Sequence, residues 1–324
     1  MPEWLYEAGI GENRAALVAD GQIVEAAIEL DGLRVGHIAR ARLIERAIVR
    51  LDSGEEAQLT GAPGGAAQGS SDAQRRWKGC GGVAEGGMLT VAITREAIPE
   101  PGRVKPPRAV ATDAAPMPGP DLLARITATG LPVRHATAHG ADTLEAAGWT
   151  ELLEEAAHGD IPFTGGALRM TPTPAMTLFD VDGSAPLEPL AVRAAAAVAL
   201  AIRRHGIGGS IGIDFPTLGG KAARMAVATA LDAHLPPPFE RTAVNGFGFL
   251  QIVRPRPRAS LPEQLRADPV AAAARATLRR LEREPGPTHR HRLPPAVLAY
   301  LLARPHWLAE LARRTGRHPD LESA

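Results

Sequence analysis

The sequence has few of the residues that crosslink a chain, stack as aromatic rings or bind metal through sulfur. Among 324 residues, Cys80 is the single cysteine and aromatic residues make up 4%. A lone cysteine excludes a disulfide within the chain and a zinc site built from cysteines. The core must therefore be assembled mainly from Ala, Leu, Val and Ile. The three lysines are Lys78, Lys105 and Lys221, so nearly all positive charge is carried by arginine.

Long apolar runs are also missing. The longest, at 191–202, is interrupted by Arg193 and falls far short of the roughly 18–20 residues that a membrane span needs. The opening residues, MPEWLYEAGI, lack a basic stretch followed by an apolar core, so we expect no secretory signal. These features predict a cytoplasmic protein in a reducing compartment, without a membrane partner.

The net charge is zero, because 36 Lys and Arg balance 36 Asp and Glu. This balance excludes a chain that coats nucleic acid as a polycation. The two signs are nevertheless separated along the chain. Residues 109–200 hold eleven acidic residues and four arginines, 254–324 hold fourteen arginines and seven acidic residues, and 34–50 hold five arginines and one glutamate. A metal site that binds an anion between basic flanks would have this distribution, and so would helices whose arginines are simply solvated.

The first third of the chain is predicted to be mainly β-structure. Ala19-Asp20-Gly21 separates two apolar runs, and Asp-Gly in that position predicts a hairpin. Residues 61–87 are rich in Gly, Ala, Ser and Gln and predict a long loop. Short strands are predicted at 14–18, 22–30, 35–44, 47–51, 88–94 and 108–112. Short strands with one long loop are typical of a small β-barrel of the OB type, although a β-meander would give a similar pattern.

The middle of the chain is mixed, and strands and helices alternate after it. A Pro-rich linker is predicted at 114–120, and Asp142 has Glu145 at the spacing of a helix capping box. Helices are predicted at 121–129, 142–158, 187–205, 218–234, 262–284 and 294–315, and strands at 176–181, 210–215 and 241–254. The strand–helix alternation predicts a sheet with helices packed on it.

Two predicted strands carry carboxylates at their ends. Asp180 lies in MTLFDVDG and Asp214 in SIGIDFP, and Asp182 projects to the same side of its strand as Asp180. A charge in an apolar strand is costly unless it is paired or binds a metal. If the strands are neighbours, the three oxygen donors suit Mg²⁺ or Mn²⁺, which activates water and neutralises phosphate charge in phosphodiester cleavage. Alternatively, each aspartate caps the turn after its strand.

Several separate blocks of the sequence, in matching order and spacing, resemble the ribonuclease E/G family. The most specific lie between residues 161 and 258, and others lie in the opening strands and at 89–109. The blocks are AMTLFDVD at 175–182, AVRAAAAVALAIRRHGIGGSIGIDF at 191–215 and FGFLQIVR at 247–254. The resemblance implies an OB-type RNA-binding barrel and an α/β nuclease domain that cleaves single-stranded RNA with Mg²⁺.

The resemblance also implies roles for single residues. Asp180 and Asp214 match the family's metal-binding aspartates, and Asp182 stands where the family has an asparagine of the catalytic site. Arg254 and Arg256 match basic positions that contact phosphates. A second aspartate of the family is replaced here by the Phe215-Pro216-Thr217 stretch, and the family's Arg before FG is replaced by Gly246. The paired cysteines that link family subunits through zinc are absent, so we expect no zinc and, if there is an oligomer, one not linked by it.

A few further residues are candidates for contacts with RNA. Lys221 follows Asp214 closely in sequence and could lie near a phosphate. Arg75, Trp77 and Lys78 combine stacking with positive charge, which suits a single strand, or else tether the loop to the core. His135 and His139 have the spacing of a metal-binding pair, but Gly140 favours a loop there. The tract from 289 to 292 is basic and is either an RNA contact or a solvated surface.

The predicted fold class is α+β: an OB-type barrel inserted near the N-terminus, an α/β nuclease domain and a helical C-terminal segment. The predicted parts are an N-terminal hairpin segment (1–32), the barrel (33–112), a shortened connection that replaces the family's 5′-monophosphate pocket (113–160), the nuclease domain (161–258) and an Arg-rich helical region (259–324). The predicted function is Mg²⁺-dependent endoribonuclease activity in RNA processing or decay. The alternative is an RNA-binding protein of the same family that has lost catalysis.

Overall fold

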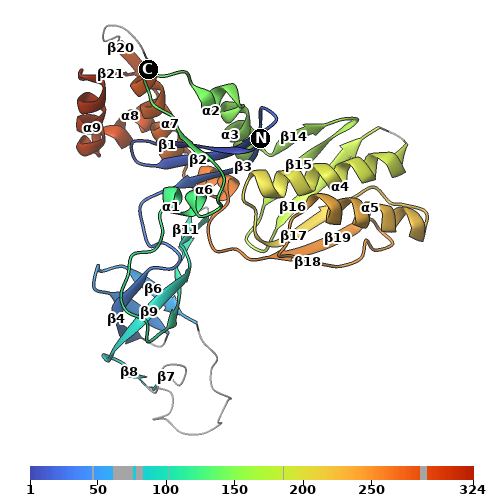
Figure 1. The fold of residues 1–324 in the computed structure, drawn as a ribbon, viewed down its shortest axis with the longest axis horizontal. Helices are drawn as coiled ribbons and strands as arrows, with labels where there is room; N and C mark the ends of the chain where they lie inside the picture. The colour runs from blue at the N-terminus through green and yellow to red at the C-terminus, as the bar shows by residue number, and fades with distance from the viewer. Residues whose placement is uncertain (46, 61–75, 78–82, 101, 185, 285–289) are drawn as a thin grey trace. The chain divides into compact units, whose positions relative to one another are not determined.

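The structure is a computed structural model that describes residues 1–324 apart from 46, 61–75, 78–82, 101, 185 and 285–289. The chain is mixed α+β and forms two compact units (Figure 1). The first unit combines Met1–Asp31, Ile126–Pro255 and Ser260–Ala324, and the second combines Gly32–Arg125 with Arg256–Ala259. No helix among the described residues is long and apolar enough to cross a membrane.

The first unit opens with a four-stranded sheet in the order β13-β1-β2-β3. Its strands are β1 (Glu3–Ala8), β2 (Asn13–Ala19), β3 (Gln22–Glu29) and β13 (Val133–His135). The predicted hairpin is present, and Asp20 and Gly21 in its turn have positive φ angles of 51° and 79°, a conformation that Asp-Gly adopts readily. β13 pairs parallel to β1, a contact between distant segments that local sequence patterns do not reveal.

Three helices pack against this sheet: α2 (Thr143–Ala146), α3 (Trp149–His158) and α6 (Leu261–Ala267). Trp149 and Leu152 join Leu5 of β1 in the shared core. The predicted cap is confirmed, because the Asp142 side chain accepts a hydrogen bond from the Glu145 amide. The single helix predicted over 142–158 is two helices, since Gly148 adopts a φ of 93° and interrupts it. The short helix α1 (Leu122–Thr127) spans the boundary between the two units.

The second unit contains a closed five-stranded barrel in the order β12-β6-β5-β4-β9. Its strands are β4 (Ile38–Glu45), β5 (Ile48–Leu51), β6 (Glu56–Leu59), β9 (Met88–Arg95) and β12 (Arg108–Ala111). All pairings are antiparallel except that of β6 with β12, which is parallel. The alanines Ala41, Ala57 and Ala109 are fully buried in the barrel core. β6 was not predicted, because its four residues alternate polar and apolar over too short a length.

Two small strand pairs complete the second unit: β7 (Arg76–Trp77) with β8 (Val83–Ala84), and β10 (Ile98–Glu100) with β11 (Arg103–Lys105). The first pair lies within the long loop predicted at 61–87. Most of that loop, with Arg75, Lys78 and Cys80, lies outside the described residues, and of Trp77 only the backbone is described.

The first unit also contains a six-stranded sheet in the order β14-β15-β16-β17-β19-β18. Its strands are β14 (Asp160–Phe163), β15 (Gly166–Pro172), β16 (Thr177–Gly183), β17 (Gly209–Asp214), β18 (Glu240–Arg241) and β19 (Phe249–Arg254). β16 and β17 run parallel and are joined through helix α4 (Leu187–Arg204), the crossover that parallel neighbours require. α4 and α5 (Lys221–His234) lie side by side on one face of this sheet (Figure 1).

The apolar positions of α4 explain this packing. Its buried residues recur at helical spacing and meet the inward side chains of the strands, such as Phe179 and Ile213. The observed helix ends one residue before the predicted end, and Gly206, with a φ of 66°, follows its C-cap. The strand predicted over 241–254 is interrupted, because a turn at 245–248 separates β18 from β19.

The C-terminal region is helical, as predicted, but each predicted helix is divided. The helices are α6, α7 (Pro269–Arg283), α8 (Pro295–Leu302) and α9 (Pro305–Thr315). Asp268 caps α7 by accepting from the Ala271 amide, and Pro305 begins α9, so both breaks occur at start signals of a new helix. A parallel pair, β20 (Arg290–Leu293) with β21 (Asp320–Ser323), was not predicted.

Candidate functional site

A row of residues in register crosses the six-stranded sheet on the face opposite its helices. Asp160 pairs with Arg169, Arg169 with Asp180, Asp180 with Asp214, and Asp214 with Phe249. Neighbouring strands of a sheet run about 4.8 Å apart, so Asp180 and Asp214 start from adjacent backbone positions. Asp214 ends β17 as predicted, whereas Asp180 lies within β16, which continues to Gly183. The two aspartates are cross-strand neighbours.

The alternation of β16 places its acidic residues on this open face. Phe179 and Val181 are buried against the helices, whereas Asp180 and Asp182 are exposed. Asp214 is exposed at the end of β17 in the same way. Asp182 lies about 7 Å further along the strand than Asp180, on the same side. The face therefore carries three exposed carboxylates, of which two are immediate neighbours.

These carboxylates have no partner within the described part of the chain. No hydrogen bond or ion pair to the side chain of Asp180, Asp182 or Asp214 occurs there, and the exposed Arg169 pairs with Asp160 at 3.7 Å. No group of three or more His, Cys, Asp or Glu side chains among the described residues is arranged to hold a metal ion. Two neighbouring carboxylates fit Mg²⁺ nevertheless, since proteins often hold it with one or two carboxylates together with substrate phosphates.

The basic residues predicted to contact phosphates lie at different distances from the aspartates. Arg254 pairs with Gly209 at the opposite end of β17 from Asp214, about 16 Å along the strands. It is half-buried, and this burial lowers its pKa although Glu25 opposes the effect. Lys221 is exposed and begins α5, the first helix after Asp214.

An exposed aromatic residue that sequence reasoning missed lies at the same end of the sheet as the aspartates. Phe247 occupies the turn at 245–248, two residues before Phe249, which is the partner of Asp214. Its exposed fraction is 84%. The signal was available in the sequence as an aromatic residue between two glycines, Gly246 and Gly248, because such a segment favours a turn over a strand interior.

The second unit carries a cluster of arginines that sequence reasoning found only in part. Arg95 and Arg108 are cross-strand partners on β9 and β12. Burial lowers the pKa of Arg95, and the positive charges of Arg108 and Arg256 lower it further against the opposing effect of Glu100. Like charges placed opposite one another destabilise a sheet. A polyanion would relieve this repulsion, which makes the cluster a candidate for phosphate contacts.

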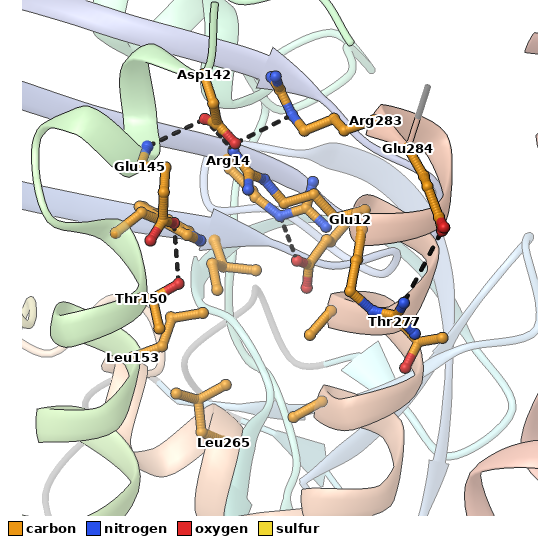
Figure 2. Close-up of a pocket in the computed structure, with 16 residues that line it drawn as sticks. Glu12, Arg14, Asp142, Glu145, Thr150, Leu153, Leu265, Thr277, Arg283 and Glu284 are labelled. Carbon is orange, nitrogen blue, oxygen red and sulfur yellow. Dashed lines mark hydrogen bonds and ion pairs between the residues drawn. The ribbon is translucent and has the colours of Figure 1, made fainter. Parts of the chain in front are cut away.

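A pocket of about 620 Å³ lies elsewhere in the first unit (Figure 2). Its wall is formed by charged side chains of β2, α2 and α7 and by apolar ones such as Leu153 and Leu265. Figure 2 shows Asp142 between the Glu145 amide and Arg283, with Arg14 bound to Glu12. Local sequence patterns indicate only the cap at Asp142, because the other members of this cluster are far apart in the chain.

The charges around this pocket are paired with one another. Arg14, which is 1% exposed, bonds to Glu7 at 2.6 Å, and Arg279 and Arg283 reach Glu7 at 2.8 and 2.7 Å. Burial alone would raise the pKa of Glu7, but Arg14 and Arg279 outweigh it and the pKa is lowered. The pKa of Asp142 is lowered in the same way by Arg279. We interpret the cluster as ion pairs that hold α7 against β1 and β2.

The weaker sequence candidates have ordinary surroundings. The His135 ring packs edge-on against Tyr6. In the basic tract, Arg290 pairs with Asp320 and Arg292 with Glu322 across β20 and β21, whereas residue 289 lies outside the described residues. These pairs link the two strands, while the side chains of Arg290 and Arg292 remain exposed.

Comparison with known proteins adds no family assignment. No protein-family model matches the chain, and no curated protein matches it. The resemblance to ribonuclease E/G thus rests on the sequence blocks alone.

Proposed function

We propose that this protein is a Mg²⁺-dependent endoribonuclease that hydrolyses phosphodiester bonds of single-stranded RNA in the cytoplasm, as its resemblance to ribonuclease E/G implies. The observation that carries the proposal is the pairing of Asp180 with Asp214 on adjacent parallel strands. Two exposed carboxylates in register, neither with an ion-pair partner among the described residues, form a negative site that favours a divalent cation, and the cation in turn favours a phosphate.

In this proposal each acidic residue has a defined task. Asp180 and Asp214 hold Mg²⁺ or Mn²⁺, which when bound activates water and neutralises charge on the phosphate. Asp182, on the same face but further along the strand, either joins them or orients the attacking water. Lys221 is the first basic residue after Asp214 in the chain and is suited to hold a phosphate of the same RNA strand.

The second unit is proposed to bind RNA as an OB-type barrel. Its closed five-strand order, with β6 parallel to β12, supports that assignment. Arg256, together with Arg95 and Arg108, supplies positive charge that suits phosphates, and such contacts carry affinity without sequence information. Arg254 is proposed to contact a phosphate as well, at the opposite end of β17 from Asp214 and therefore away from the acidic site.

The alternative function is RNA binding without catalysis. It is favoured by Pro216, which follows the strand end where the family has a further aspartate, so that only two carboxylates are neighbours. Incubating the purified protein with an unstructured fluorescent RNA, with Mg²⁺, Mn²⁺ or EDTA, separates the two functions. Cleavage that EDTA abolishes supports the nuclease. Binding without cleavage in either metal supports the binding protein and overturns the proposed reaction.

A further inference from the structure

Phe247 is exposed to an extent that its residue type does not predict. Among the described residues other than Met1, it is the most exposed large apolar side chain, at 84%. By contrast, Phe179 of β16 and Phe215, which directly follows β17, are 1% and 3% exposed. Single exposed apolar residues are common on protein surfaces. Two further features, the rigidity of its turn and its place beside the carboxylates, set Phe247 apart.

Hydrogen bonds from both sides of the turn hold the backbone around Phe247. The Asn245 side-chain oxygen accepts from the amides of Phe247 and Phe249 at 2.9 and 3.0 Å, and the Asn245 carbonyl accepts from Gly248 at 3.2 Å. The Phe215 amide donates to the Gly248 carbonyl at 3.2 Å. Gly248 has a φ of 97°, and a Cβ there would lie 2.2 Å from the Phe215 carbonyl oxygen, so only glycine fits. The ring therefore projects from a fixed turn.

The same contacts tie the turn to the acidic site. Phe215, which bonds to Gly248, directly follows Asp214, and Phe249 is the cross-strand partner of Asp214. The Thr217 hydroxyl also donates to the Phe247 carbonyl, at 3.5 Å. Phe247 therefore lies in a turn that is hydrogen-bonded to the segment directly after Asp214, at the end of the sheet.

We propose that Phe247 stacks on an unpaired base of the RNA strand whose phosphate is bound at Asp180 and Asp214. The inference rests on the proposed function for its ligand. An aromatic ring beside a negative site does not suit an apolar protein surface or an anionic membrane, whereas a nucleotide presents both a flat base and a phosphate. Stacking tolerates any base but requires that the base be unpaired, which restricts the substrate to single strands.

The test uses the full-length protein and a short unstructured RNA that carries 2-aminopurine, whose fluorescence falls when it stacks. The variants are Phe247→Ala, Phe247→Leu and Phe247→Trp, with Met225→Ala as the control, since Met225 is 59% exposed on α5. We expect Phe247→Ala and Phe247→Leu to weaken single-strand binding about 5- to 150-fold, the factor that one stacked base supplies, and to lose the quenching. Phe247→Trp and Met225→Ala retain both.

The outcomes separate this inference from the proposed catalysis. If the parent protein cleaves RNA and Phe247→Ala binds and quenches as the parent does, the stacking role is overturned and the nuclease stands. If the parent binds RNA without cleaving it and Phe247→Ala loses that binding, the stacking role stands and the nuclease fails. If the parent neither binds nor cleaves RNA, both proposals are overturned. If each variant unfolds at the same temperature as the parent protein, its fold is unchanged.

Discussion

Asp180 and Asp214 face the same side of a sheet from directly paired positions on two parallel strands. Each is exposed, and within the described residues neither has a cationic partner. Two like charges in this arrangement repel each other and destabilise the sheet that holds them. A divalent cation bound by both carboxylates would attract each of them and so remove the net repulsion. The stability of the folded protein should therefore depend on metal binding.

Mg²⁺ should therefore stabilise the parent protein and not the Asp180→Asn or Asp214→Asn variants. A ligand that binds only the folded state adds about 1.4 kcal/mol when its free concentration is ten times its Kd. Without metal, each variant should be at least as stable as the parent, because one repelling charge is gone. Thermal unfolding with increasing MgCl₂, and with NaCl at equal ionic strength as the control, measures this. Equal Mg²⁺ stabilisation of parent and variants would contradict a site at these residues.

The buried ion pairs around Glu7 should make a large contribution to the stability of the first unit. Glu7→Gln should lower the free energy of unfolding at pH 7 by about 3 kcal/mol, the low end of the range for breaking a buried pair, because Glu12 and Asp142 still pair with the arginines. The control, Asp232→Asn, breaks the more exposed pair with Arg241 and should cost at most about 1 kcal/mol. Urea unfolding followed by tryptophan fluorescence compares them.

The Glu7→Gln variant also tests how the stabilising effect of Glu7 depends on pH. The folded pKa of Glu7 is lowered by its arginines, so its stabilising effect is complete above the unfolded pKa of about 4.3 and is lost as the pH falls through the folded value. The difference between parent and Glu7→Gln should stay constant from pH 7 to about 5 and shrink at lower pH. A difference that persists unchanged in acid would show that the charge of Glu7 is not its source.

The arginine cluster of the second unit should determine the salt dependence of RNA binding. Arg108→Gln should weaken binding and reduce the slope of log K against log salt by about 1, because one phosphate contact is lost. The variant should be no less stable than the parent, since Arg108 opposes Arg95. Arg103→Gln is the matched control, because Arg103 already pairs with Glu100 at 2.7 Å. An equal loss of slope in both variants would show that the cluster has no special role.

Much of the site could be predicted from sequence because its signals are local. The apolar runs that end in Asp180 and Asp214, the Asp20-Gly21 hairpin and the cap at Asp142 each depend on a few consecutive residues. The long apolar face of α4 likewise defined its ends within one residue. That the two aspartates are neighbours could be predicted only on the condition that their strands pair.

What could not be predicted depends on contacts between distant segments. Arg95 meets Arg108 through the register of the barrel, and Glu7 meets Arg279 through packing of α7 on β1, so neither pair has a local signature. The resemblance predicted that Arg254 contacts phosphates without saying where, and the antiparallel register of β19 places it at the opposite end of β17 from Asp214. Strand register, which no local pattern reveals, therefore determines which of the predicted residues lie beside the aspartates.

The most direct test of the account is the cleavage of an unstructured fluorescent RNA by the parent protein and by Asp214→Asn, in Mg²⁺, with binding measured in parallel. Asp320→Asn, which changes an exposed aspartate of β21, is the control. We predict Mg²⁺-dependent cleavage by the parent and the control, and cleavage at background with nearly unchanged RNA binding by Asp214→Asn. Cleavage by Asp214→Asn at the parent rate would contradict a reaction that depends on the Asp180–Asp214 pair.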